Sequence, residues 1–140
     1  MESWTNKYIH VPFADKGRSE EGCDCWGLAR LIYLKELGIE LPTLLDYRDT
    51  LDRPTIAGLY ENESLNWLSV TPGSEQPFDV VVMTMLGFPM HIGVVQRSGF
   101  MIHCLKGVGT AVVNYKSRQW AKRVVGFYRH VNNSNKSFTV

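Results

Sequence analysis

A cysteine near the start of the chain and two later histidines are the residues best suited to nucleophilic chemistry. Cys25 lies in the run Cys-Asp-Cys-Trp, and His91 and His103 are twelve residues apart. A cysteine becomes a nucleophile when the pKa of its thiol is lowered and a histidine within hydrogen-bond reach accepts its proton. One imidazole would be the general base, and the other would fix its tautomer and direction. These three residues are therefore the candidate catalytic group.

A long amphipathic helix is predicted to begin beside Cys25. Apolar residues recur at one-turn spacing after Asp24, and Gly38 ends the run where a C-cap glycine is expected. Cys25 would then lie at the helix N-terminus, where unpaired N–H groups and the macrodipole favour a thiolate and lower the thiol pKa. Asp24 is expected to cap this helix rather than to take part in catalysis.

The two histidines fall on neighbouring predicted strands. Because the connection at 98–99 is too short for a parallel crossover, the strands that hold His91 and His103 must be antiparallel neighbours. Segments rich in β-branched and aromatic residues predict five strands, at 78–86, 91–97, 100–105, 110–115 and 123–130. We expect an α+β fold in which the long helix covers a five-stranded antiparallel meander.

The remaining segments are more loosely specified. The proline-rich stretch 39–77 predicts a connection with a short helix near 55–62 and a weak strand near 67–70, and one helical turn is expected at 117–122. The length of 140 residues predicts a single domain, 1–140, with a core of about 8–130. Residues 131–140 are a polar tail without periodicity.

The overall composition excludes several classes of partner. The formal net charge is +1, and no basic stripe is present, so no nucleic-acid partner is expected. No apolar run approaches the roughly 18 residues of a membrane span, and the N-terminus lacks the features of a signal peptide. We therefore expect synthesis in the cytoplasm and no membrane insertion. A substrate outside that compartment would have to be reached through a holin, a secretion machine or a virus particle.

Two alternatives to a catalytic cysteine remain open at this stage. Cys25 taken alone could be an inert thiol that packs on the helix face, and His10 and His130 are expected to be structural. The second alternative is a zinc site, although the one-residue spacer between the first two cysteines is shorter than that of most structural zinc sites. The candidate zinc ligands are Cys23, Cys25, His91, His103 and Cys104. We expect no metal or other cofactor.

Three short blocks of sequence suggest a known family. They are Asp24-Cys25-Trp26-Gly27-Leu28, His91-Ile92-Gly93-Val94-Val95 and Met101-Ile102-His103. In order and spacing they resemble the signature blocks of the NlpC-type family of papain-like cell-wall peptidases, over roughly Tyr8 to Tyr128. The resemblance implies a papain-like fold in which Cys25 is the nucleophile, His91 the base and His103 the orienting residue. Asp24 and Trp26 would support the helix cap or the oxyanion site.

Details around the first block are similar to a subgroup encoded by tailed phages and prophages. Trp26 replaces the usual serine, and Pro12-Phe13 and Gly17-Arg18 precede it. This likeness implies other tail proteins as partners and a place in the virion tail, from which the protein would act in the host periplasm or cell wall. Phe13 occupies the position of a family tyrosine whose hydroxyl assists the active site, which leaves Tyr8 as another source of a hydroxyl.

The implied activity is that of a cysteine endopeptidase. Its substrate would be the peptidoglycan stem peptide, cut in the stem or the cross-link, typically next to D-glutamate or diaminopimelate. One alternative keeps the fold and the nucleophile but makes the protein an amidase or an acyltransferase. The other is a non-enzymatic structural module of a tail tip.

Overall fold

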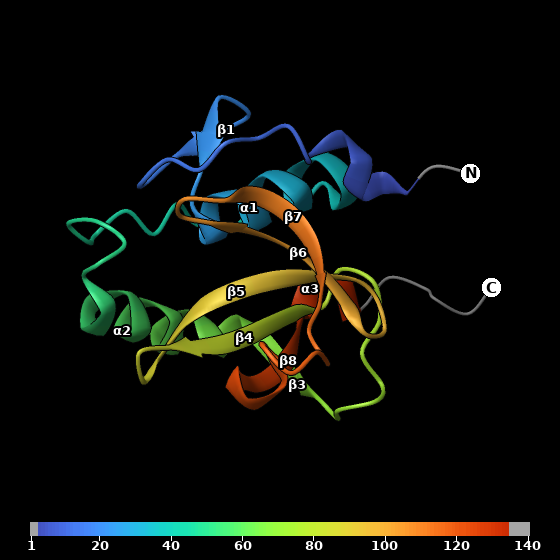
Figure 1. The fold of residues 1–140 in the computed structure, drawn as a ribbon. Coiled ribbons are helices and arrows are strands. Elements are labelled where there is room, and N and C mark those ends of the chain that lie inside the picture. The colour runs from blue at the N-terminus through green and yellow to red at the C-terminus, as the bar shows by residue number, and fades with distance from the viewer. Residues whose placement is uncertain (1–2, 135–140) are drawn as a thin grey trace.

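A six-stranded antiparallel sheet forms the centre of the protein, in a computed structural model that describes residues 3–134 (Figure 1). The strand order is β3-β8-β4-β5-β6-β7. The strands are β3 (Trp67–Val70), β4 (Val80–Met85), β5 (Phe88–Arg97), β6 (Phe100–Leu105), β7 (Gly109–Asn114) and β8 (Val124–His130).

The predicted five-stranded meander is wrong in its strand order and strand number. β4 to β7 do follow one another as a meander, but β8 returns past them and pairs with the free edge of β4, with Val81 opposite Phe127. The weak signal at 67–70 is a real strand, β3, which pairs with β8. β4 is therefore an inner strand, which agrees with its nearly continuous apolar run Val-Val-Val-Met.

The predicted long helix is present, but its second half has a different geometry. α1 (Cys25–Ile32) continues into the π-helical segment η2 (Tyr33–Leu37), and Gly38 ends it with a left-handed φ of 67°. α1 packs on β5 and β6. Leu28, Ile32 and Ile92 are almost fully buried in this layer, and each such side chain contributes roughly 1.5–3 kcal/mol through burial. This layer fixes where the start of α1 meets the sheet.

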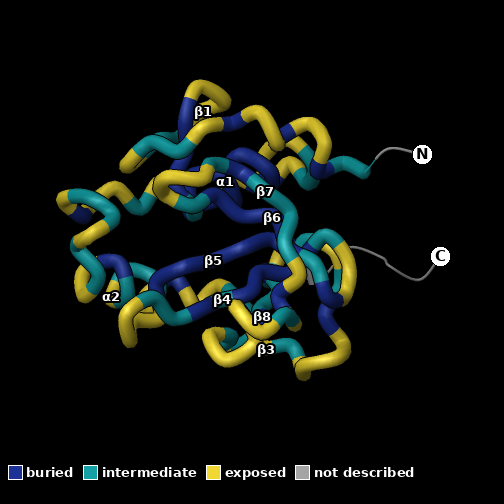
Figure 2. Tube along the Cα trace, in the orientation of Figure 1, coloured by how far each residue is buried: buried dark blue, intermediate teal, exposed yellow. Residues whose placement is uncertain are grey.

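A second core lies on the opposite face of the sheet. Because successive strand residues point to opposite faces, Val81, Met83 and Val95 pack away from α1, together with Trp120 and Phe127. Figure 2 shows that β4, β5 and β6 are largely buried, whereas exposed segments surround them. The sheet is thus covered on both faces.

The remaining elements cover the ends of the sheet. They are η1 (Trp4–Lys7), β1 (Arg18–Ser19), β2 (Gly22–Cys23), α2 (Arg53–Glu63), η3 (Ser64–Asn66), η4 (Ala121–Arg123) and α3 (Val131–Ser134). α2 is the short helix predicted at 55–62, and it begins with Pro54 in its first turn. α3 occupies the start of the predicted polar tail, and positions 135–140 of that tail lie outside the described residues. Within 3–134, no helix has the length and apolar character needed to cross a membrane.

Candidate active site

Cys25 is the first residue of α1, and Asp24 caps the helix. The Oδ1 atom of Asp24 accepts a hydrogen bond from the backbone N–H of Gly27 at 2.9 Å. This contact satisfies one of the N–H groups that a helix leaves free at its start. The cap therefore fixes the direction in which the side chain of Cys25 projects from the backbone.

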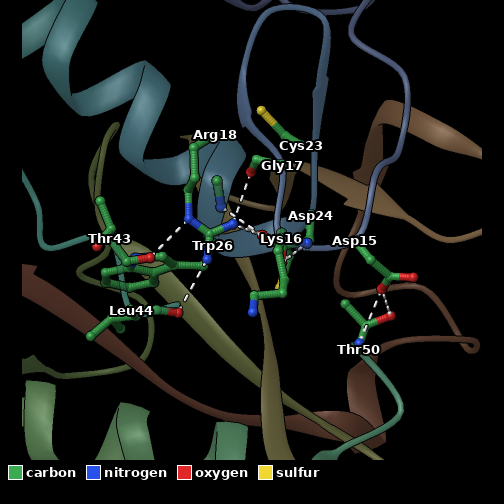
Figure 3. Close-up of polar contacts among 12 residues, drawn as sticks. Asp15, Lys16, Gly17, Arg18, Cys23, Asp24, Trp26, Thr43, Leu44 and Thr50 are labelled. Atoms are coloured by element: carbon green, nitrogen blue, oxygen red, sulfur yellow. Dashed lines mark hydrogen bonds and ion pairs between the residues drawn. The ribbon is translucent and has the colours of Figure 1, made fainter. Parts of the chain in front are cut away.

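An ion pair holds Asp24 in place. Nη1 of Arg18 lies 2.7 Å from Oδ1 of Asp24, and both side chains are largely buried. The hydroxyl of Tyr47 donates to the same carboxylate. The Arg18 guanidinium also donates to the carbonyls of Thr43 and Leu44 (Figure 3). The β1–β2 ribbon, the start of α1 and the segment 43–47 are therefore joined at one carboxylate.

Trp26 contacts both the chain segment that connects α1 with α2 and α2 itself. Its Nε1–H donates to the carbonyl of Pro42 at 2.8 Å, and its ring packs against Tyr60 of α2 at a centroid distance of 5.5 Å. The residue that replaces the usual family serine thus anchors the chain that connects α1 with α2.

The thiol of Cys25 faces Tyr60, a residue that the sequence did not single out. Sγ lies 3.3 Å from Oη of Tyr60 and 3.9 Å from the carbonyl of Met90. Tyr8, the hydroxyl source considered from the sequence, instead donates to Glu36. No local signal marks Tyr60, because α2 has only a weak amphipathic pattern and the contact spans 35 residues.

Burial makes the thiol a weaker acid than the sequence suggested. The pKa of Cys25 is raised to about 11, chiefly by burial and then by the negative charge of Asp24. The hydrogen bond from Tyr60 acts in the opposite direction, but it is the smaller influence. The expected lowering of the thiol pKa is therefore wrong for this conformation, in which desolvation and the charge of Asp24 raise it.

The two histidines lie in direct contact. Nε2 of His91 is 2.7 Å from Nδ1 of His103, and both residues are buried. On β5, the residues paired with β6 lie between Val94 and Arg97. His91 precedes this paired stretch, so the two imidazoles meet beyond the Val94 end of the pairing. The ring of Trp120 stacks on His91 at 5.9 Å and meets His103 edge-on at 5.1 Å, which shields the pair.

Both imidazoles are neutral at physiological pH. Burial lowers the pKa of His91 to about 3, with a smaller contribution from the neighbouring His103, and it lowers the pKa of His103 to about 4. A neutral imidazole can accept a proton, which a general base requires. The tautomer of each ring depends on which nitrogen donates in the His91–His103 bond.

The structure brings these residues together as two separate pairs. His91 contacts His103 and Cys25 contacts Tyr60, whereas the described residues include no hydrogen bond from the Cys25 thiol to either histidine. The cavity beside the thiol measures only about 20 Å³, roughly enough for one water molecule. Segment 44–60 closes it, with Tyr47 and Tyr60 in the wall.

The other two cysteines make local contacts. Sγ of Cys23 donates to the carbonyl of Ser19, and Sγ of Cys104 donates to the carbonyl of Cys23. All three cysteines are free thiols. Across positions 3–134, no three His, Cys, Asp or Glu residues are grouped as metal ligands, so the set considered for zinc does not converge on one point.

The fold and the site together define a class of protein. A cysteine begins a helix that packs on a mostly antiparallel sheet, and two histidines from adjacent strands are paired. This mixed α/β architecture is consistent with a papain-like fold. The chain belongs to the NlpC/P60 family, whose sequence pattern matches residues 10–129. No curated protein sequence matches the chain.

Solved structures of this family share the fold. A protein similar to a lipoprotein of the NLP/P60 family from Staphylococcus aureus subsp. aureus Mu50 gives a TM-score of 0.65 at 19% identity over 89% of this chain. An NlpC/P60 family protein from Bacillus cereus ATCC 10987 gives 0.67 at 21% identity over 90%. The NlpC/p60 domain of the peptidoglycan hydrolase SagA gives 0.58 at 23% identity over 89%.

The likeness covers different shares of these three proteins. The chain spans 38% of the Staphylococcus chain and 37% of the Bacillus chain, but it covers 90% of the SagA domain. The matched part of this chain is therefore similar in extent to the SagA NlpC/p60 domain.

Proposed function

We propose that the protein is a cysteine endopeptidase that hydrolyses peptide bonds in the stem or cross-link of bacterial peptidoglycan. The observation that carries the proposal is the buried His91–His103 pair in an NlpC/P60 chain whose α1 begins with Cys25. The description of SagA as a peptidoglycan hydrolase supports the choice of substrate.

In the proposed reaction, Cys25 attacks the carbonyl carbon of the scissile bond while His91 takes the thiol proton. Free N–H groups at the start of α1 stabilise the oxyanion, and His91 then gives its proton to the leaving amine as the C–N bond breaks. Water hydrolyses the thioester, which releases a carboxylate and restores the thiol. In the described conformation the thiol contacts Tyr60 and the ring of His91 stacks on Trp120. Before the attack, the thiol and His91 must therefore come within hydrogen-bond reach of each other, and segment 44–60 must admit the peptide.

The experiment that tests the proposal uses defined muropeptides and product analysis by mass spectrometry. The intact protein is expected to yield fragments with a new amine and a new carboxylate, and Cys25→Ala is expected to yield none. Cys23→Ala is a matched control, because it removes a nearby buried thiol that donates to the Ser19 carbonyl. Cleavage that survives in Cys25→Ala would contradict the mechanism.

Other outcomes of the same experiment separate the remaining candidates. Transfer of the acyl group to an added amine, without hydrolysis, would favour the acyltransferase alternative. No product from any variant would favour a structural module.

The setting is a further part of the proposal. We propose that the protein acts from a phage or prophage tail on the wall of the host, on the basis of Trp26 and the blocks Pro12-Phe13 and Gly17-Arg18. Proteomic analysis of purified particles after prophage induction tests this setting. The chain should be recovered with tail proteins, and its recovery only from the cell fraction would contradict a tail location.

A further inference from the structure

A large cavity lies between α2 and the sheet, next to the candidate active site. Its volume is about 640 Å³, within the range of small-molecule sites. Val80, Val82 and Ile92 of β4 and β5 give the lining an apolar part, and Ala57 and Gly58 of α2 also belong to the lining. The cavity is far larger than the space beside the thiol.

Aromatic rings and two carboxylates give this cavity its chemical character. Its aromatic lining consists of Trp26, Tyr60, Trp67, Phe88 and Tyr128. Glu61 and Glu63 are the charged residues of the lining, which contains no lysine, arginine or histidine among the described residues. The wall therefore carries a negative charge beside several π-faces.

Glu63 is held in this wall by neutral donors. Its carboxylate accepts hydrogen bonds from Nε1 of Trp67 at 3.0 Å and from Nδ2 of Asn66 at 3.1 Å, and the residue is buried. Within the described chain, neither Glu63 nor Glu61 forms an ion pair with a basic side chain. A cation in the cavity would therefore be near the negative charge of Glu63 and of the exposed Glu61, and it would not have to displace a basic side chain of the described residues.

Such a wall selects an alkyl chain that ends in an ammonium group. The apolar residues bury the methylene groups, and the carboxylates and ring faces attract the positive charge. A second carboxylate on the ligand would be repelled by the negative charges of Glu61, which is exposed at the edge of the cavity, and Glu63. The lysine side chain has the favoured chemistry, whereas diaminopimelate carries an additional carboxylate beside its distal amine.

Two shared side chains connect this cavity with the nucleophile. Trp26 and Tyr60 line both the large cavity and the small one beside Cys25. We propose that the cavity is the subsite for the ammonium side chain of a lysine in the peptide substrate, so that the protein favours lysine-type over diaminopimelate-type stem peptides. This inference rests on the proposed peptidase function.

A binding experiment tests the subsite without relying on catalysis. n-Pentylamine is titrated into the Cys25→Ala protein, and binding is followed by the fluorescence of Trp26 and Trp67 and by chemical shifts. Saturable binding of n-pentylamine but not of pentanoate is expected. Glu61→Gln should weaken this binding about tenfold, whereas Glu21→Gln, an exposed acid on the β1–β2 turn, should not change it.

A second variant fills the space instead of changing the charge. Ala57→Leu adds apolar volume to the lining of the cavity and should abolish n-pentylamine binding while the fold is retained. Equal binding of amine and carboxylate, or binding that is unchanged in both Glu61→Gln and Ala57→Leu, would overturn the subsite.

The catalytic arm uses three stem peptides that differ at one residue, with lysine, Nε-acetyl-lysine or meso-diaminopimelate. The lysine peptide should show a kcat/KM at least about tenfold higher than either of the others, and Glu61→Gln should reduce that preference. Cleavage without a preference for lysine overturns the subsite but not the peptidase. Amine binding without any cleavage overturns the peptidase but leaves the cation site.

Discussion

At the scale of single residues, the thiol of Cys25 is subject to opposing influences. The helix N-terminus and the Tyr60 hydroxyl favour the thiolate, while burial and the neighbouring Asp24 favour the neutral thiol. Burial makes the largest contribution to a pKa that is raised to about 11, so the resting thiol is protonated at neutral pH. Activation of the nucleophile must therefore accompany substrate entry, which replaces this enclosed environment with contact to a base.

We predict an unusually high pH for the reaction of this thiol with iodoacetamide. In the free protein, alkylation of Cys25 should rise with pH towards a midpoint near 11, because the pKa of the thiol is raised to about 11. In the intact protein, the hydrogen bond with the Tyr60 hydroxyl lowers the pKa of Cys25. Tyr60→Phe removes that bond and should therefore move the midpoint to a higher pH. Site-resolved mass spectrometry of the alkylated protein gives both midpoints.

The control for this prediction is Tyr128→Phe. Tyr128 lines the large cavity but not the space beside the thiol, so its loss should leave the midpoint unchanged. A midpoint near 7 in the intact protein would contradict the prediction and would indicate a thiolate–imidazolium pair in solution.

Whether the sequence could predict a contact in the site depends on how far apart its two residues lie along the chain. The cap at Asp24 depends on neighbours three residues away, and such local chemistry is visible in a sequence. The contact between His91 and His103 followed from one short hairpin. Tyr60 could not be predicted, because the fold of a loosely patterned segment brings it to the thiol.

At the scale of elements, close packing of two glycines sets the position of α1. A Cβ atom on Gly27 would lie 2.0 Å from the carbonyl oxygen of Gly17, a backbone atom of the loop before β1. Glycine at this position lets the first turn of α1 approach that loop, and this approach brings Arg18 to the cap at Asp24.

We therefore predict that Gly27→Ala destabilises the protein by roughly 2–4 kcal/mol, as expected for overpacking against backbone. Gly58→Ala is the matched control on α2, where a new Cβ meets no atom within 4 Å. Because alanine favours helices, that substitution should be neutral or stabilising by up to about 1 kcal/mol. Urea denaturation measures both effects. A similar midpoint for the two variants would contradict the requirement for glycine at position 27.

The histidine pair is also a contact between elements, because it joins β5 and β6 beyond the end of their backbone pairing. The pKa values of His91 and His103 in the folded protein, about 3 and about 4, lie below the ordinary value of 6.5. Their contribution to stability is therefore complete above pH 6.5 and is lost as the pH falls towards the folded values.

We predict a loss of roughly 2 kcal/mol per histidine between pH 6.5 and pH 5. The free energy of unfolding, measured with urea at several pH values, should show this slope. The slope should be flatter in the double variant His91→Gln, His103→Gln and unchanged in His10→Gln, which alters an exposed histidine. A double variant with the same slope as the intact protein would assign the acid sensitivity to other groups.

The order of the strands illustrates what sequence patterns do not contain. Each of the five predicted segments is a strand, since alternation and composition are properties of the segment itself. The return of β8 to the edge of β4 depends on pairing across more than 40 residues, as in Val81 with Phe127. A local pattern indicates that a strand exists, but it does not indicate its neighbour.

At the scale of the whole molecule, one connecting region encloses the Cys25 thiol and separates it from solvent. Segment 44–60 closes the space over Cys25, and α2 also forms one wall of the large cavity. Arg18 holds the start of this region through the carbonyls of Thr43 and Leu44. Access to the thiol and to the proposed lysine subsite should therefore depend on the same contacts.

We predict that Arg18→Lys loosens this region while the sheet stays intact. Lysine keeps the charge near Asp24, but it cannot form the fork that reaches both carbonyls. The loss of about 1.4 kcal/mol or more of local stability corresponds to at least tenfold faster amide hydrogen exchange over 43–60, and alkylation of Cys25 should accelerate with it. Arg48→Lys, at an exposed arginine that forms an ion pair with its neighbour Asp49, should change neither rate. Faster exchange spread evenly over β4, β5 and β6 would instead mean that Arg18 stabilises the whole fold. The thiol would then become accessible through global unfolding and not through local opening of segment 43–60.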